Sequence, residues 1–150
     1  MAVKRTASAA PAGTVLAFDY GTQRIGVAVG ETATAVAHPL TTLVHRHSHA
    51  PFERIAALVT EWRPALLLVG LPTHADGTPH AMTARARRFA EELRRRFAVP
   101  VAFADERFTT QHARSALRES GASPRARDDA RDSVAAQIML QAYLDACHAA

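Results

Sequence analysis

The stretch from Val15 to Glu31, VLAFDYGTQRIGVAVGE, constrains the fold more than any other part of the chain. Residues 15–18 form an apolar run typical of a buried strand, 21–23 supply turn residues, and 25–30 form a second β-rich run. This pattern predicts a β-hairpin. Because an unpaired buried carboxylate would cost several kcal/mol, we expect Asp19 to be paired, hydrogen-bonded or bound to a cation. The competing interpretation is a turn-forming aspartate, since Asp is common near Gly in hairpins.

Length and composition limit the class of protein. The chain has 150 residues, which suits one ordinary domain and leaves no room for a second catalytic domain. Apolar residues make up 48% and charged residues 21%, as in soluble globular proteins. The net charge of +4 and the pI of about 10.2 come mainly from arginine, which pairs bidentately with phosphate and favours a polyanionic partner. A compositional habit of the source would also explain the excess, because Lys4 is the only lysine.

The cysteine count and the N-terminal segment bear on the compartment. Cys147 is the only cysteine, so the chain can form neither an internal disulfide nor a cysteine-based metal cage, as is typical of the reducing cytoplasm. Residues 1–13 lack the apolar core of a secretory signal, and we expect a flexible tail before a single domain at 14–147. No apolar run is long enough to span a membrane. We therefore expect a cytoplasmic protein with no membrane partner.

The middle of the chain predicts helices alternating with strands. A third, edge-like strand is expected over 34–44, where Pro39 lacks a backbone N–H. A helix follows between Pro51 and Pro64, with apolar residues at helical spacing. The apolar run at 65–71 is typical of a central strand buried on both faces.

The second half of the chain continues the alternation. The expected elements are a helix over 79–97, a strand over 99–104, a helix from Thr109 or Thr110 to Arg118, a polar loop over 123–127 and a helix over 128–147. The order β-β-β-α-β-α-β-α-α predicts an α/β fold with a mixed five-stranded sheet and helices on both faces.

Two groups of side chains have structural interpretations beside functional ones. His45, His47 and His49 alternate in an HRHSH segment, but no cysteine or acidic ligand accompanies them, so a polar loop is favoured over a metal site. The arginines at 94–96 complement the C-terminal dipole of the helix over 79–97, which is a structural reason for that cluster.

Three acidic residues lie where apolar elements begin or end. Asp19 ends the first strand, Glu106 follows the last strand, and Asp132 lies in the first turns of the last helix. If the first and last strands run parallel, their C-terminal ends meet at one edge of the sheet, where α/β folds place their sites. Converging carboxylates would repel one another unless cations neutralised them. Mg²⁺ suits such a site, and two divalent ions could activate a water for attack on phosphorus.

Each of these acids also has a simpler explanation. Glu106 could pair with Arg107, and Asp132 could simply favour a helix N-terminus. The order of the elements makes a shared site the better interpretation of the three together.

Several motifs in the same order as in a known family strengthen this interpretation. The sequence closely resembles the YqgF family, also called RuvX, of pre-16S ribosomal RNA nucleases, which has a ribonuclease-H-like fold related to Holliday junction resolvases. The resemblance covers about residues 14–146. It is carried by FDYGTQRIGVAVG at 18–30, LLLVGLPTHADGT at 66–78, TARARRFAEEL at 83–93, ADERFTT at 104–110 and DSVAAQIMLQAYL at 132–144.

The resemblance implies a set of site residues and a cofactor. Asp19, Glu106 and Asp132 would be the catalytic acids and would bind Mg²⁺ or Mn²⁺. The residues implied to border the site or to hold the substrate are Arg24, Thr73 and Asp76 in the loop at 73–78, Arg107 and Thr109. Arg85 and Arg88 are further candidates for holding the nucleic-acid backbone, whose contacts position a substrate without reading its sequence.

One segment departs from the family pattern. The family commonly has a Lys- and Gly-rich approach to the last acid, whereas this chain has Arg127-Asp128-Asp129-Ala130-Arg131. The extra carboxylates could weaken the approach of phosphate or contribute to the site, and the two arginines could replace the missing lysine charge.

Four functions remain to be distinguished. The leading hypothesis is a metal-dependent nuclease that trims the 5′ end of precursor 16S ribosomal RNA on a ribosome precursor, acting as a monomer or weak homodimer. The same chemistry on a branched DNA junction would usually call for a two-fold dimer. Actin-like ATPases and sugar kinases share a DxGT-like first loop, but they close two such domains over a nucleotide. A catalytically silent nucleic-acid binder would bind RNA in a salt-sensitive way without needing Asp19.

Overall fold

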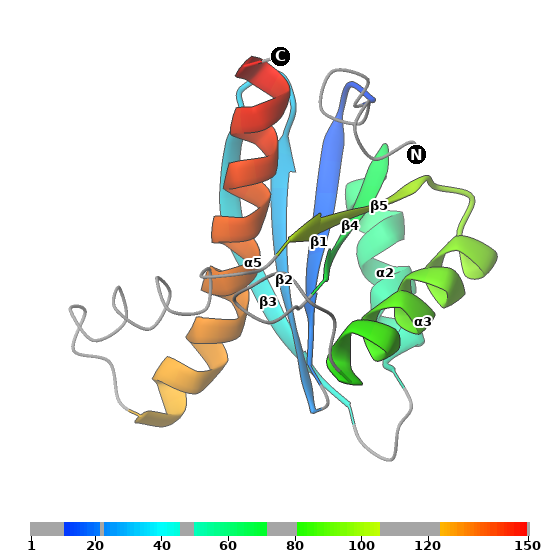
Figure 1. Cartoon of the computed structure of the whole chain (residues 1–150), viewed down its shortest axis with the longest axis vertical. Coiled ribbons are helices and arrows are strands. Elements are labelled where there is room, and N and C mark those ends of the chain that lie inside the picture. The colour runs from blue at the N-terminus through cyan, green and yellow to red at the C-terminus, as the bar shows by residue number, and fades with distance from the viewer. Residues whose placement is uncertain (1–10, 22, 46–49, 72–80, 106–123, 150) are drawn as a thin grey trace.

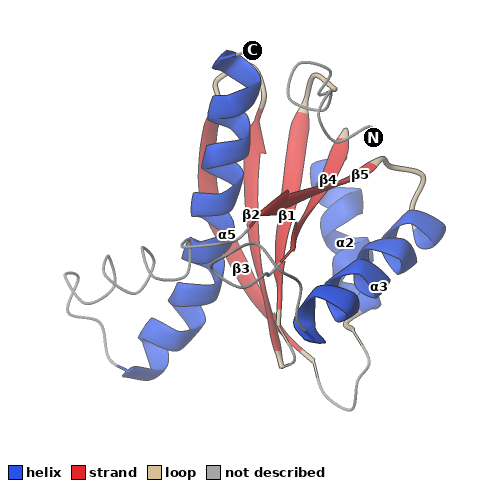
Figure 2. Ribbon diagram, in the orientation of Figure 1, coloured by secondary structure: helices blue, strands red, loops and turns tan. Residues whose placement is uncertain are grey.

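The computed structural model describes residues 11–21, 23–45, 50–71, 81–105 and 124–149 (Figures 1 and 2). Their elements, in chain order, are β1 (Thr14–Tyr20), β2 (Arg24–Glu31), β3 (Val36–Val44), α2 (Phe52–Trp62), β4 (Leu66–Leu71), α3 (Ala81–Arg96), β5 (Val101–Asp105) and α5 (Pro124–Ala149). The predicted helix starting at Thr109 or Thr110 lies outside the described residues.

The five strands form one mixed sheet in the order β3-β2-β1-β4-β5. β1 pairs antiparallel with β2 through the predicted hairpin and parallel with β4, and β4 pairs parallel with β5. The predicted edge strand is β3, and the predicted central strand is β4, of which residues 66–70 are buried. The α/β fold class and the mixed five-stranded sheet are therefore confirmed.

The helices divide between the two faces of the sheet (Figure 2). Leu16 and Phe18 of β1 pack in one apolar cluster with residues of α2 and α3, such as Ile55. The alternate residues Val15 and Ala17 pack in a second cluster with α5. This two-residue period assigns each strand position to a face. No helix in the described part of the chain is long and apolar enough to cross a membrane.

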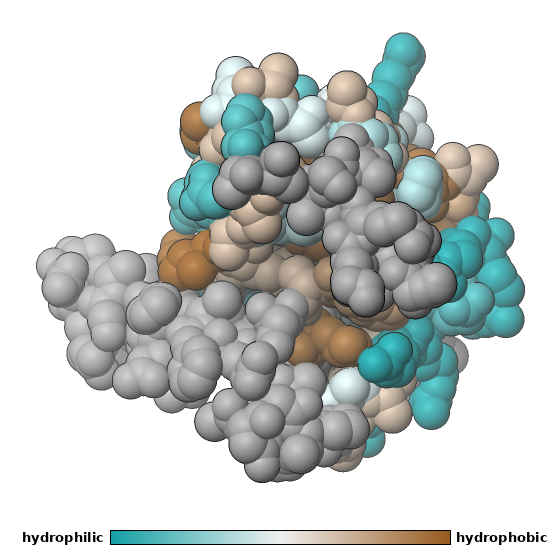
Figure 3. All heavy atoms as spheres, turned by 45° about the horizontal axis from the view of Figure 1, so that its top comes forward, coloured by the Kyte–Doolittle hydropathy of each residue, from teal (hydrophilic) through white to brown (hydrophobic). Residues whose placement is uncertain are grey.

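The α3 helix separates a buried side from a charged one. Figure 3 shows hydrophilic residues, in teal, over the side of the molecule where α3 lies in Figure 1. Arg94 bonds Glu91 at 2.7 Å, and both Arg95 and Arg96 bond Glu92. The arginines of the last turn thus have ion-pair partners on their own helix, in addition to the position at its C-terminal end.

The last helix differs from its prediction. α5 begins at Pro124, whereas a polar loop was expected over 123–127 and a helix only from 128. The physical reason is that proline suits the first turn of a helix, where its missing N–H has no partner to lose. Asp132 consequently lies eight residues after the helix start and not in its first turns.

Two glutamines of α5 bind the backbone of the edge strand and of the turn before it. The Gln141 side chain accepts a hydrogen bond from the Ala37 N–H at 3.0 Å and donates one to the Ala35 carbonyl at 2.7 Å. Gln137 donates to the Ala37 carbonyl at 3.1 Å. These contacts fix α5 to β3 as well as to the centre of the sheet.

Tyr143 of α5 should make the free energy of unfolding depend on pH under alkaline conditions. Its hydroxyl is buried without a hydrogen-bond partner among the described residues. Burial raises the pKa of Tyr143 above its ordinary value of about 10, and the neighbouring Cys147 raises it further. Above pH ~10 the tyrosine of the unfolded chain ionises, which lowers the free energy of the unfolded state, while the folded chain keeps its proton. The free energy of unfolding therefore falls as the pH rises.

Replacement of Tyr143 by phenylalanine is expected to remove that alkaline loss. At neutral pH the free energy of unfolding should stay the same or rise by up to about 1 kcal/mol, because a buried hydroxyl without a partner is lost. Urea unfolding at neutral and alkaline pH measures both effects. Tyr20→Phe is the matched control and should keep the wild-type pH dependence, since Tyr143 remains. An unchanged alkaline loss in Tyr143→Phe would contradict the prediction.

Candidate nuclease centre

Three parallel strands end at the same edge of the sheet. β1, β4 and β5 run in one direction, which meets the condition for a shared edge, and their last residues are Tyr20, Leu71 and Asp105. The C-terminal ends of parallel strands are where α/β folds commonly bind ligands. The predicted acids should therefore lie at this edge of the sheet.

Asp19 lies on the face of the sheet that α5 covers. Val15 and Ala17 of the same strand pack in the α5 cluster, and the alternation of a strand places Asp19 on the same side. It is the penultimate residue of β1, partly buried, and its register partner in β2 is Gly26. The strand extends one residue beyond Asp19, which therefore forms part of the β-ladder and not of the turn.

Gly26 lets the last helix approach the sheet beside Asp19. A Cβ atom at this position would lie 1.8 Å from the backbone oxygen of Asp132, so a side chain cannot fit there. Directly paired residues in an antiparallel ladder have Cα atoms about 4.5–5.5 Å apart. The structure thus brings Asp132 to the strand pair that carries Asp19, as the predicted site requires.

Arg24 bridges the hairpin and the helix. Its Nε donates a hydrogen bond to the Asp132 Oδ2 at 2.6 Å, and the two side chains are 31% and 19% exposed. A charge-assisted bond in a partly buried position holds the carboxylate orientation more firmly than a surface pair. Arg24 was predicted to border the site, and it lies in direct contact with one of the predicted acids.

The position of Asp132 is not explained by a preference of aspartate for a helix N-terminus. Charges interact with the helix dipole mainly within the first turn, and Asp132 lies beyond the second turn of α5. Its position at the sheet is set by the contact with Gly26 and by the ion pair with Arg24.

The donor chemistry suits a hard divalent cation. Two carboxylates on one face can bind Mg²⁺ together with waters and substrate oxygens. Glu106, the third predicted acid, lies outside the described residues, and within the described part of the chain no group of three potential metal ligands occurs. Asp19 and Asp132 are thus the part of the proposed metal set that the structure describes.

The remaining predicted site residues fall into two groups. Arg85 and Arg88 lie on α3, on the opposite face of the sheet from Asp132, so the structure does not bring them to the acids. The candidates outside the described residues are Thr73, Asp76, Arg107 and Thr109.

His45 directly follows β3 outside any regular element, but its side chain is buried and not that of an exposed polar loop. Its side chain is only 4% exposed, and its Nε2 lies 2.7 Å from the Gly21 carbonyl oxygen. The backbone N–H of His45 also donates to the Gln23 carbonyl, so the residue closes the open side of the hairpin turn. The available signal was the strand period, because His45 lies two residues after the buried Leu43. His47 and His49 lie outside the described residues.

Comparison with known proteins shows the family to which this chain belongs. The family model described as RuvX, Holliday junction resolvase, matches residues 13–146. A protein of Dechloromonas aromatica, named "Putative pre-16S rRNA nuclease", is 53% identical over 91% of this chain and 93% of its own length. A protein of Nitrosomonas europaea with the same name is 52% identical over 95% of this chain and 97% of its own.

A solved structure supports the fold. Thermus thermophilus RuvC, determined in complex with a Holliday junction substrate, matches 87% of this chain and 93% of its own with a TM-score of 0.50. At 20% sequence identity this likeness concerns the ribonuclease-H-like architecture alone. The match of the family model over residues 13–146, together with relatives that are more than 50% identical over nearly their whole length, shows that the chain belongs to the RuvX family.

Proposed function

We propose that this protein is a metal-dependent nuclease that hydrolyses phosphodiester bonds at the 5′ end of precursor 16S ribosomal RNA. The observation that carries the proposal is the close approach of the Asp132 backbone to Gly26, which is the ladder partner of Asp19 near the C-terminal end of β1. The RNA substrate is supported by relatives that share about half of their residues with this chain over nearly their whole length.

The carboxylates have a defined task in this proposal. Asp19 and Asp132 would hold Mg²⁺ or Mn²⁺, and the bound metal would supply activation of water and neutralisation of the leaving oxygen. Glu106 is proposed as the third ligand: Ala102 and Ala104 of β5 pack on the α5 face, and the strand period predicts the same face for position 106.

Arg24 would orient the carboxylate of Asp132 and would also attract the phosphate of the substrate. Its bond to Asp132 orients the carboxylate, and its positive charge lies beside the place where a scissile phosphate would approach. A guanidinium in a partly buried site favours an anionic substrate and the charge that grows on phosphorus during attack. Arg24 is therefore proposed as a positioning residue.

A branched DNA junction is the second candidate substrate. It is favoured by the description of the matching family and by the RuvC-like architecture. Both candidates use the same acids, so they differ in the substrate and not in the chemistry.

Cleavage of a 5′-extended precursor 16S RNA and of a four-way DNA junction, side by side with Mn²⁺ or with EDTA, tests the proposal. RNA cutting that requires Mn²⁺ and exceeds junction cutting is the expected result. Preferred cutting of the junction would replace the RNA substrate by the resolvase activity. Metal-independent binding without cutting of either substrate would overturn the nuclease and leave a nucleic-acid-binding protein.

A further inference from the structure

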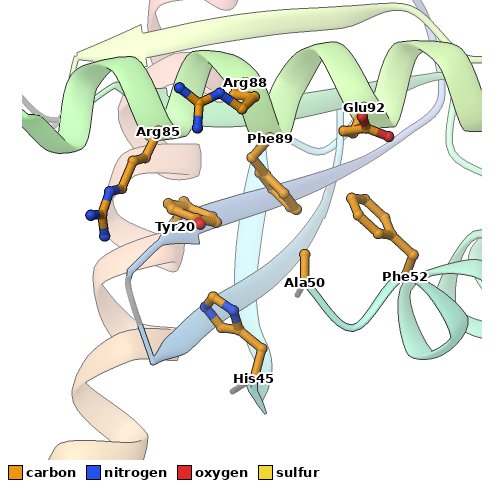
Figure 4. A pocket seen from close by; sticks show the side chains of 8 residues that line it. All are labelled: Tyr20, His45, Ala50, Phe52, Arg85, Arg88, Phe89 and Glu92. Atoms are coloured by element: carbon orange, nitrogen blue, oxygen red, sulfur yellow. The ribbon is translucent and has the colours of Figure 1, made fainter. Parts of the chain in front are cut away.

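A cavity opens on the opposite face of the sheet from the acids, beside the same end of β1. It has a volume of about 270 Å³ and lies between α3, the start of α2 and the end of the hairpin (Figure 4). Its lining consists of aromatic and basic residues together with Ala50 and one acid, Glu92, which is paired with Arg95 and Arg96; the others are Tyr20, His45, Phe52, Arg85, Arg88 and Phe89. Tyr20 directly follows Asp19 in β1, so the cavity and the acids share one strand end.

One side of the cavity is aromatic. The Tyr20 and Phe89 ring centroids are 4.9 Å apart with an interplanar angle of 32°, and Phe52 lies 6.0 Å from Phe89. Figure 4 shows these rings below α3, with the His45 ring beneath Tyr20. Aromatic rings at a cavity are the surfaces on which unpaired bases stack, with a gain of about 1–3 kcal/mol per base.

The other side is cationic. Arg85 and Arg88 are exposed on the first turns of α3, and within the described part of the chain neither has a carboxylate partner. This distinguishes them from the arginines at 94–96, whose charges are paired with Glu91 and Glu92. Guanidinium groups without carboxylate partners bind phosphate through charge-assisted hydrogen bonds.

His45 adds a buried hydrogen-bond acceptor. Because the Gly21 carbonyl can only accept, the contact at 2.7 Å requires the proton on Nε2, which leaves Nδ1 of the neutral ring as an acceptor. Nδ1 is buried and has no hydrogen-bond partner among the described residues. An ionised phosphodiester has no donor to offer this atom, whereas a ribose hydroxyl or the N–H group of a base does.

We propose that this cavity binds one nucleotide of a single-stranded RNA. The base packs against the partly exposed ring of Tyr20, which the buried Phe89 supports from behind. The adjoining phosphate is held by Arg85 and Arg88, and His45 Nδ1 accepts a hydrogen bond from the nucleoside. A second hollow of about 680 Å³ shares Phe52 and Arg88 with the first and gives room for the chain to continue.

This inference rests on the proposed function for its substrate class and extends it to a binding subsite. A nucleotide held beside Tyr20 would anchor the strand one residue from the carboxylate of Asp19, on the other side of the sheet. Arg85 and Arg88 lie on the opposite face of the sheet from the acids. In this proposal they bind a different part of the same RNA strand.

Binding of a labelled short single-stranded oligouridylate, measured by fluorescence anisotropy in EDTA, tests the subsite without cleavage. The double variant Arg85→Ala/Arg88→Ala is expected to weaken binding at least about tenfold, as loss of charge-assisted hydrogen bonds predicts. The matched control Arg94→Ala/Arg95→Ala removes the same charge from the same helix and should have a much smaller effect. Equal weakening by both pairs would overturn the proposal, because net charge alone would then explain binding.

A second pair of variants tests the stacking surface. Tyr20→Leu should weaken oligouridylate binding about fivefold to tenfold, and Tyr20→Phe should restore it, because the ring and not the hydroxyl makes the contact. Uridine monophosphate should compete with the oligonucleotide better than inorganic phosphate does. Wild-type affinity in Tyr20→Leu, or equal competition by phosphate, would exclude a nucleotide subsite.

The outcomes separate this inference from the proposed function. If RNA is cut but binding is indifferent to the Arg85 and Arg88 pair, the subsite fails and the nuclease stands. If binding shows the expected dependences but no RNA is cut with Mn²⁺, the nuclease fails and the subsite stands. Circular dichroism and thermal melting of each variant establish that the fold is retained.

Discussion

Asp19→Asn is expected to lower the rate of metal-dependent RNA cleavage by at least about a hundredfold. The substitution keeps the shape of the side chain but removes the negative charge that would bind the cation, and a metal supplies several kcal/mol of transition-state stabilisation. Because Asp19 lies in the β1–β2 ladder and not in the turn, the amide should be tolerated by the fold. Initial rates over a range of Mn²⁺ concentrations measure the loss.

Asp145→Asn is the matched control for this experiment. Asp145 is an exposed carboxylate on α5 that accepts a hydrogen bond from Gln141, and it lies away from the strand end that carries Asp19. Its replacement should leave the cleavage rate unchanged. RNA binding in EDTA should be retained by both variants. A fully active Asp19→Asn protein would remove Asp19 from the catalytic centre.

Gly26→Ala is expected to destabilise the fold by at least about 3 kcal/mol. The added methyl group would lie 1.8 Å from a backbone oxygen of α5, and a backbone atom cannot rotate away as a side-chain end can. The helix would have to move off the sheet. Urea unfolding followed by circular dichroism measures the change in the free energy of unfolding.

The same substitution should also damage the proposed centre. Displacement of α5 would move Asp132 away from Asp19, and a shift of about 1 Å in a catalytic group can cost about a hundredfold in rate. Gly30→Ala, on the same strand and face, is the matched control. Its nearest backbone contact, the Val36 oxygen, would lie at 2.9 Å and not at 1.8 Å, and its other close contacts are the flexible ends of Leu140 and Leu144. If Gly26→Ala were no more destabilising than Gly30→Ala, the contact between Gly26 and Asp132 would not limit how closely α5 packs on β2.

Strand positions were the part of the fold that could best be predicted from sequence. The period of two in β1 fixes which residues share a face, so the placement of Asp19 follows once the α5 side is known. The start of α5 was wrong because residues 124–131 are mostly polar and carry no apolar stripe, while Pro124 suggested a loop. Local pattern alone cannot distinguish a proline that begins a helix from one that follows it.

The contacts that assemble the site could not be predicted from local pattern. Arg24 and Asp132 are 108 positions apart, and their ion pair depends on how closely α5 packs on β2. Glycine at position 26 permits that approach, but in the sequence it is indistinguishable from a glycine of the turn. The sequence also predicted helices on both faces without assigning α3 to either. Its side follows from the right-handed crossover between the parallel strands β4 and β5.

The binding of α5 glutamines to β3 has a consequence for self-association. An edge strand with exposed N–H and C=O groups can template pairing with another chain and start fibres. Here the polar backbone groups of Ala37 are occupied by Gln141 and Gln137, the Ala35 carbonyl is occupied too, and Pro39 has no N–H to offer. Successive outward positions of this edge are thereby closed to strand addition. The helix that brings Asp132 to the sheet thus also protects the protein from edge-to-edge aggregation.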